Sequence, residues 1–194
     1  MQNYLTIDVE DYFQVLAFAD MVSTSDWESM EQRVYNNTQH ILRLLKKYRV
    51  HATFFIVGWI AEKHPDVVRA IAADGHEIGC HSYWHRPVYE LTPEAFREDT
   101  LKAKQALEKI CGKAVTAYRA PSYSITKKSL WALDILKEAG FTTDSSIFPI
   151  WHDFYGIPDS PRFPYQLNPQ EIAEYPISTV LLFGKTIPVS GGGY

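Results

Sequence analysis

The stretch Ala52-Thr-Phe-Phe-Ile-Val57 is apolar, β-branched or aromatic at nearly every position. A strand with such residues on both faces is covered on both faces, which is typical of parallel sheets in α/β proteins. A helical pattern precedes this strand, with its repeating positions at Val34, Thr38, Ile41, Leu42, Leu45 and Tyr48. A second helix is predicted after the strand, from Pro65 to Gly75, because proline suits the first helical turn and glycine the C-cap. The local order is therefore helix, strand, helix.

The same alternation runs along most of the chain. Further strands are predicted at residues 4–9, 76–80, 115–118 and from 141. Further helices are predicted from Thr92-Pro93 to Gly112 and from Thr126 to Gly140. Repeated βα units imply parallel strands joined by right-handed crossovers, so the expected fold class is α/β, either a barrel or a doubly wound sheet.

Composition is compatible with one globular domain over residues 1–194. The chain is 46% hydrophobic and 22% charged, with a formal net charge of −4 and a pI near 6.0. Without a basic excess, nucleic acid is not an expected partner, and protein partners are not indicated. The first residues do not show the basic segment followed by an apolar segment that is typical of a signal peptide. The longest apolar stretch, Ala52 to Ala61, is too short for a membrane span. We expect a cytoplasmic location and no integral membrane segment.

Two imidazoles stand four residues apart in His81-Ser-Tyr-Trp-His85, directly after a predicted strand. Imidazole is a good ligand for zinc and neighbouring divalent metals, so this spacing suggests a metal site. The first strand ends in Asp8-Val-Glu10-Asp11, which offers carboxylates for a third ligand. Two histidines and one carboxylate would leave positions open for water and substrate, as in a catalytic site.

Four polar residues stand at or just beyond the ends of separate predicted strands: Asp8, His81, Arg119 and Asp144. Active sites of α/β barrels are built at the carboxyl ends of the strands. This placement favours the barrel and an enzyme.

These motifs resemble those of the polysaccharide deacetylases of carbohydrate esterase family 4, the NodB-homology domain. The resemblance is carried by a first motif at Thr6-Ile-Asp8, a second at His81-Ser-Tyr-Trp-His85 and a third at Arg119-Ala-Pro-Ser-Tyr123. It implies a deformed (β/α) barrel and metal-dependent removal of acetyl groups from an acetylated polysaccharide or oligosaccharide. N-acetyl groups are favoured over O-acetyl groups. Asp-Val-Glu-Asp-Tyr-Phe and Arg-Ala-Pro-Ser-Tyr-Ser are most similar to the branch associated with exopolysaccharide synthesis and exosortase systems.

The resemblance also implies residue roles. Asp8 matches the general base, and His81 and His85 match ligands of one divalent ion, zinc by preference. In the common family pattern an aspartate follows the base, but here Val9 stands in its place. Glu10 is then the predicted carboxylate ligand, because a period of two places it on the face of Asp8, with Asp11 as the alternative.

Further residues are expected around these groups. Arg119 is predicted to orient Asp8 through a bidentate pair and to keep it ionised. Tyr123, Trp84 and Pro121 are predicted to line the substrate groove.

No segment of the chain resembles the family's last motif, whose histidine is the general acid. We therefore expect the domain to be truncated after Ser190-Gly-Gly-Gly-Tyr194, with the last strand and the acid beyond residue 194 and the barrel incomplete. His152 is the fallback acid. Two alternatives stay open: a metal-independent cyclic amide hydrolase on the same barrel, and a catalytically inactive carbohydrate-binding domain.

Overall fold

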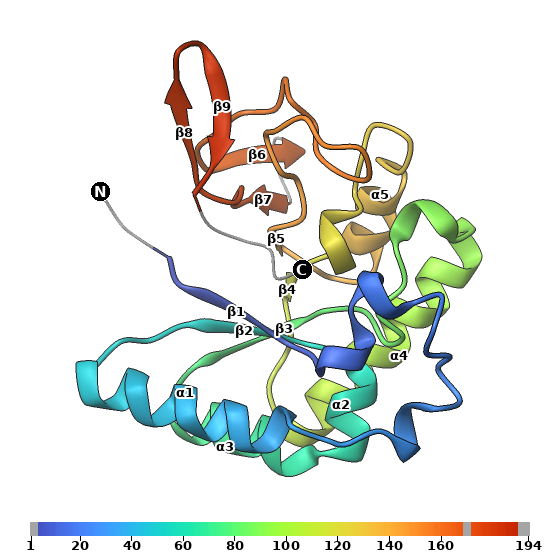
Figure 1. Cartoon of the computed structure of the whole chain (residues 1–194), viewed down its shortest axis with the longest axis vertical. Coiled ribbons are helices and arrows are strands. Elements are labelled where there is room, and N and C mark those ends of the chain that lie inside the picture. Colours follow the sequence, from blue (N-terminus) through green and yellow to red (C-terminus); the bar gives the residue numbers. More distant parts are fainter. Residues whose placement is uncertain (1–3, 169–171, 190–194) are drawn as a thin grey trace. The chain divides into compact units, whose positions relative to one another are not determined.

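The computed structural model describes residues 4–168 and 172–189 (Figure 1). The chain divides into two compact units. The first comprises the chain up to His85 together with Asp99–Val115, and the second comprises Arg86–Glu98 and the chain from Thr116 onward. The prediction of a single domain over residues 1–194 stays a prediction.

The first unit is built on three parallel strands: β1 (Thr6–Val9), β2 (Thr53–Ile56) and β3 (Glu77–Cys80). β2 lies between the other two, with Phe55 opposite both Asp8 and Gly79. Phe54, Phe55 and Ile56 are almost fully buried, as the apolar stretch predicts. Figure 1 shows the helices α1 (Val34–Tyr48) and α3 (Pro65–Ala73) along one face of these strands.

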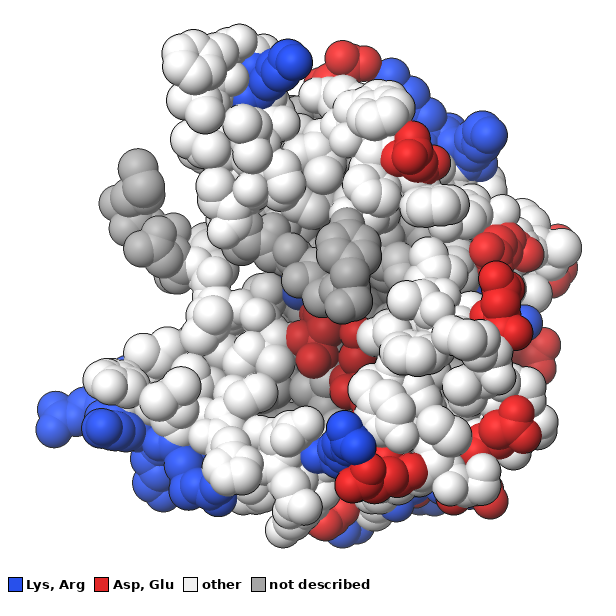
Figure 2. Space-filling model, viewed as in Figure 1, with Lys and Arg blue, Asp and Glu red and all other residues white. Residues whose placement is uncertain are grey.

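The helix ends follow the expected chemistry. Proline opens α3, and α4 (Pro93–Cys111) is preceded by Thr92, whose Oγ1 accepts the backbone N–H of Ala95 at 3.2 Å. Helix α1 is capped by Arg49, which directly follows Tyr48 and has a φ of 54°. Lysine and arginine side chains gather at that end (Figure 2), where cations are favoured by the helix dipole.

A short helix that the sequence pattern did not predict, α2 (Gly58–Lys63), follows β2 directly. Gly58 begins it at a close approach, because a Cβ at this position would lie 2.7 Å from Tyr83 Cδ2 and 2.9 Å from the backbone of Ala103. The absence of a side chain at residue 58 therefore lets the start of α2 pack closely against both α4 and the segment after β3.

The second unit holds β4 (Ala117–Tyr118), β5 (Thr143–Asp144) and β7 (Ile172–Glu174), which are parallel neighbours in that order. β6 (Tyr165–Asn168) pairs with β7 in antiparallel orientation, and β8 (Thr179–Leu182) forms a hairpin with β9 (Lys185–Pro188). The α/β class with parallel strands is confirmed in both units.

One predicted helix begins later than expected. Helix α5 spans Ala132–Glu138, whereas the cap at Thr126 predicted an earlier start. The residues in between form a turn in which Ser129 Oγ accepts the backbone N–H of Thr126 at 2.9 Å, and Leu130 in this turn is 42% exposed.

Two further expectations concern the end of the chain and membrane-spanning segments. The expected chain end at 190–194 and the acid beyond it lie outside the described residues. Among residues 4–168 and 172–189, no helix combines the length and hydropathy that a membrane crossing requires.

Candidate metal centre and its supports

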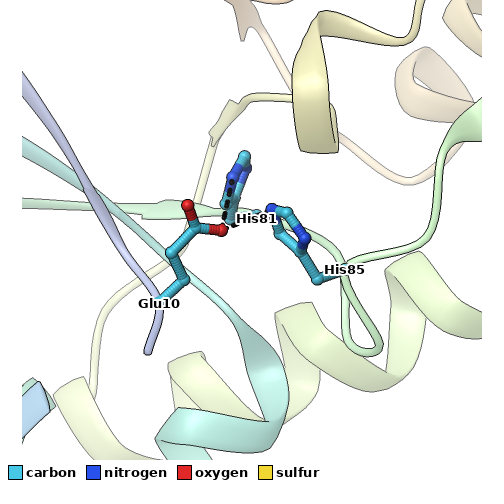
Figure 3. Close-up of side chains that lie close together, drawn as sticks. All are labelled: Glu10, His81 and His85. Atoms are coloured by element: carbon cyan, nitrogen blue, oxygen red, sulfur yellow. Dashed lines mark ion pairs between the residues drawn. The ribbon is translucent and has the colours of Figure 1, made fainter. Parts of the chain in front are cut away.

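Glu10, His81 and His85 point toward one another in the first unit (Figure 3). Glu10 Oε2 lies 2.5 Å from His85 Nε2 and 4.0 Å from His81 Nε2. One ligand atom from each residue falls within 4.8 Å of the other two. Both imidazoles are buried, while the Glu10 side chain is 24% exposed.

The backbone brings these groups together at the carboxyl ends of two strands. Glu10 directly follows β1, and His81 directly follows β3, where its N–H donates to the carbonyl of Ile56 at 3.0 Å. The segment up to His85 is not helical, since Ser82 and His85 have φ values of 60° and 52°. Such left-handed residues carry strain that the surrounding contacts must hold, and they cluster at functional sites.

Asp99 is one source of that support, from inside α4. Its carboxylate accepts the backbone N–H of Tyr83 at 2.6 Å and of Trp84 at 3.2 Å, the two residues between Ser82 and His85. Ser82 Oγ accepts the N–H of His85 at 2.9 Å. Asp99 carries no signal in the sequence, because an acid within a helical pattern gives no sign that it faces another segment.

The charges of the cluster are coupled. Burial raises the pKa of Glu10, but the charge and hydrogen bond of His85, with a smaller effect from His81, outweigh it and lower the pKa to about 2. Burial lowers the pKa of His85, yet the Glu10 carboxylate outweighs burial and raises it above its ordinary value. An ionised carboxylate beside two imidazoles is thus the preferred state of the cluster.

The two acids near Glu10 in the sequence, Asp8 and Asp11, are placed differently. Asp11 is 3% exposed and accepts backbone N–H groups from Tyr12 at 3.1 Å, Arg33 at 2.7 Å and Val34 at 3.0 Å. It joins the end of β1 to the start of α1. Val9 is buried in the core, and half-buried Asp8 contributes to the raised pKa of His85, so it lies within electrostatic reach of the cluster.

The three residues fit a divalent cation. Two imidazole nitrogens and one carboxylate oxygen converge from two strand ends, and Glu10 Oε2 is buried without a hydrogen-bond donor in the described residues other than its His85 ion pair. This donor set matches that of catalytic zinc sites with two histidines and one acid.

In the second unit, Arg119 directly follows β4 and is 3% exposed. Its Nε donates to the carbonyl of Ser145 at 3.1 Å and its Nη2 to Ser145 Oγ at 2.7 Å, while the guanidinium lies 5.8 Å from the ring centre of Tyr123. The predicted pair with Asp8 joins residues of different units and stays a prediction. Of the predicted groove residues, Tyr123 and Pro121 are mostly buried, and Trp84, in the first unit, is half-exposed.

Asp144 ends β5 and stands opposite Glu174 of β7, and both are fully buried. Ser146 donates to Asp144 at 2.6 Å, and the N–H of Ile147 donates to Glu174 at 3.0 Å. Burial raises the pKa of both acids, and for Glu174 the Asp144 charge raises it further. Burial and the neighbouring carboxyl group therefore favour the protonated form of Glu174 more than water would. Glu174 had not been singled out in the sequence.

The comparisons with known proteins agree with this architecture. The family model described as polysaccharide deacetylase matches residues 16–143, more than half of the chain. The chain belongs to the polysaccharide deacetylase family. A second model, described only as a domain of unknown function, matches residues 145–194.

Named relatives of this polysaccharide deacetylase family member include two curated proteins. A peptidoglycan-N-acetylglucosamine deacetylase of Bacillus cereus is 37% identical over 98 residues, covering 50% of this chain and 36% of that protein. A chitooligosaccharide deacetylase of a Bradyrhizobium species is 29% identical over 99 residues, covering 51% of this chain and 43% of that protein. The matched parts are less than half of either relative.

Solved structures show the same fold. A crystal structure from Mycobacterium smegmatis, of a protein provisionally assigned as a polysaccharide deacetylase, matches with a TM-score of 0.68 and 28% identity, over 90% of this chain and 58% of that one. A peptidoglycan N-acetylglucosamine deacetylase matches with a TM-score of 0.54 and 27% identity, over 75% of this chain and 56% of that one.

Proposed function

We propose that this chain is a metal-dependent hydrolase that removes acetyl groups from a sugar polymer, with N-acetyl groups favoured over O-acetyl groups. The observation that carries the proposal is the convergence of Glu10, His81 and His85 in a member of the polysaccharide deacetylase family. The relatives named above act on peptidoglycan and chitooligosaccharides, which are N-acetylated carbohydrates. We extend the proposal to exopolysaccharide as the polymer, because the segments around the first and third motifs are most similar to the branch associated with exopolysaccharide synthesis.

In this proposal Glu10, His81 and His85 hold one divalent ion, and zinc suits their two nitrogens and one oxygen. Such an ion supplies a water of lowered pKa and polarises the acetyl carbonyl. Asp8 would serve as the general base, accepting a proton at its carboxylate. The buried imidazoles exclude bulk solvent from one side of the cluster, which strengthens the electrostatic effects within it.

The proposal is tested by substitutions that separate ligand from base. His81→Ala should abolish both stoichiometric zinc and acetate release from N-acetylglucosamine oligomers. Asp8→Asn keeps the shape but not the basicity, so it should retain zinc and lower turnover by about 100-fold or more. His40→Ala, which removes an exposed histidine on α1, is the matched control and should change neither quantity.

The outcomes also separate the alternatives. Full turnover without metal would favour the cyclic amide hydrolase. Zinc and oligomer binding without any acetate release would favour the inactive binding domain. Zinc retained in His81→Ala would contradict the proposed ligand set, and zinc lost from Asp11→Asn but not from Glu10→Gln would transfer the ligand role to Asp11.

A further inference from the structure

Two large aromatic side chains lie in solvent on one loop of the second unit. In the segment 147–157, here called the aromatic loop, Trp151 is 77% exposed and Phe154 is 61% exposed. Large aromatic residues are highly buried on average in globular proteins, so two exposed within four residues are a feature to explain. The loop falls within the segment that matches a domain of unknown function.

The aromatic loop is built around a stack of rings. Tyr155 lies parallel to His152, with 3.8 Å between ring centres and 9° between planes, and parallel to Phe148, at 5.9 Å and 7°. Phe154 packs at an angle on His152, at 6.0 Å. The exposed rings are therefore carried by a loop whose other aromatic residues are fixed against one another.

Backbone contacts close the loop tightly. The N–H groups of Ile150 and Ile157 both donate to the carbonyl of Phe148, at 2.9 and 2.8 Å. Gly156 has a φ of 96°, and a Cβ there would lie 2.3 Å from the carbonyl oxygen of Ile150. A platform fixed in this way loses little conformational entropy when a ligand binds to it.

The aromatic loop is continuous with a residue of the third motif. The ring of Tyr123 packs on Phe148 at 5.3 Å and on Tyr155 at 6.0 Å. Tyr123 was predicted from the sequence to line the substrate groove, and it follows Arg119 in the same unit. One end of the ring stack thus rests on the third motif, and the other carries the exposed aromatic residues.

We infer that the aromatic loop is a carbohydrate-binding subsite that receives sugar rings of the polymer on Trp151 and Phe154. This inference rests on the proposed function for the identity of the polymer. A pyranose ring has an apolar C–H face and hydroxyl groups at its edge. Flat exposed rings suit that face, and Asp153, which lies between them in the sequence, offers a carboxylate that can accept hydrogen bonds from the hydroxyl groups.

The charge of the loop supports a neutral sugar over a lipid surface. Among its residues, Asp153 is the acid and there is no lysine or arginine, whereas interfacial membrane segments combine exposed aromatic residues with lysine or arginine. Lys127, which lies outside the loop, is paired with Asp159 at 2.9 Å.

The test measures binding directly, using N-acetylglucosamine dimers and hexamers with wild type, Trp151→Ala and Phe154→Ala. Each substitution should weaken hexamer binding roughly tenfold, as expected for the loss of one well-buried apolar contact, with a smaller loss for the dimer. Trp151→Phe should restore much of the affinity, because it retains a flat ring. Tyr48→Ala removes a 63% exposed aromatic residue from α1 and should bind like wild type.

The result is distinguishable from failure of the proposed function. If acetate is never released but Trp151→Ala still weakens hexamer binding, the deacetylase proposal fails and the subsite stands. Equal hexamer affinity in wild type, Trp151→Ala and Phe154→Ala would overturn the subsite. So would an equal loss in Tyr48→Ala, or a change of oligomeric state in Trp151→Ala with hexamer affinity unchanged, which would assign the loop to contacts between copies.

Discussion

Replacing Asp99 by alanine tests how the segment between the two histidines is held. Asp99 is 4% exposed and accepts two backbone N–H groups, at 2.6 Å from Tyr83 and 3.2 Å from Trp84. Hydrogen bonds to a charged partner contribute about 1.5–3 kcal/mol each. The bond to buried Tyr83 belongs at the upper end and the longer bond to half-exposed Trp84 below it. We expect the free energy of unfolding to fall by about 4–5 kcal/mol.

The same substitution should weaken zinc binding by roughly 10- to 100-fold, because Asp99 supports the segment that carries the two proposed histidine ligands without being a ligand itself. Asp99→Asn retains one carbonyl acceptor and should fall between wild type and alanine in both measurements. Glu98→Ala removes an exposed acid from the neighbouring position of α4 and is the control. Urea unfolding and competitive zinc titration measure the two effects, and values for Asp99→Ala equal to those of Glu98→Ala would refute the reasoning.

The remaining predictions concern buried groups near the strand ends. The pKa of Glu174 is raised by burial and by Asp144, so the stabilising effect of its bound proton is full below the ordinary pKa and is lost as pH rises through the raised one. Glu174→Gln should flatten the pH dependence of urea unfolding above the ordinary glutamate pKa of about 4.3, and an unchanged slope would contradict this. Gly58→Ala should destabilise by about 1–2 kcal/mol, since a clash of about 1–3 kcal/mol with Tyr83 exceeds the helix-propensity gain of about 0.5–1; a raised melting temperature would disprove the close approach. Asp11→Ala leaves three backbone N–H groups without their carboxylate and should lower the free energy of unfolding by about 2–4 kcal/mol. A loss below about 0.5 kcal/mol, typical of a surface site, would show that β1 and α1 are joined by other means.

Much of the fold could be predicted because its signals are local. Pro65 and Thr92 mark helix starts, Gly75 and Gly112 follow helix ends, and the strand β2 is recognisable from its composition. Helix α2 escaped prediction because the apolar run continues from Ala52 to Ala61 across two elements. Periodicity alone does not separate a buried strand from a buried helix in such a run.

The site was predictable where its residues stand at strand ends. Glu10 followed from the period of two in β1, and the structure places it with His81 and His85. Asp99 and Glu174 could not be found this way. Each is distant in sequence from the groups it contacts, so only the packing of α4 and the pairing of β5 with β7 bring them there.

The position of Asp11 has a consequence for protein engineering. Glu10 is fixed in space because the next residue binds the first turn of α1, more than twenty positions away in the chain. A designer who transplanted the histidine segment and the strand β1 into another scaffold would leave the carboxylate without this anchor. The smallest portable version of the cluster therefore includes the start of α1, and a graft of the three side chains alone should lose the approach of Glu10 to His85.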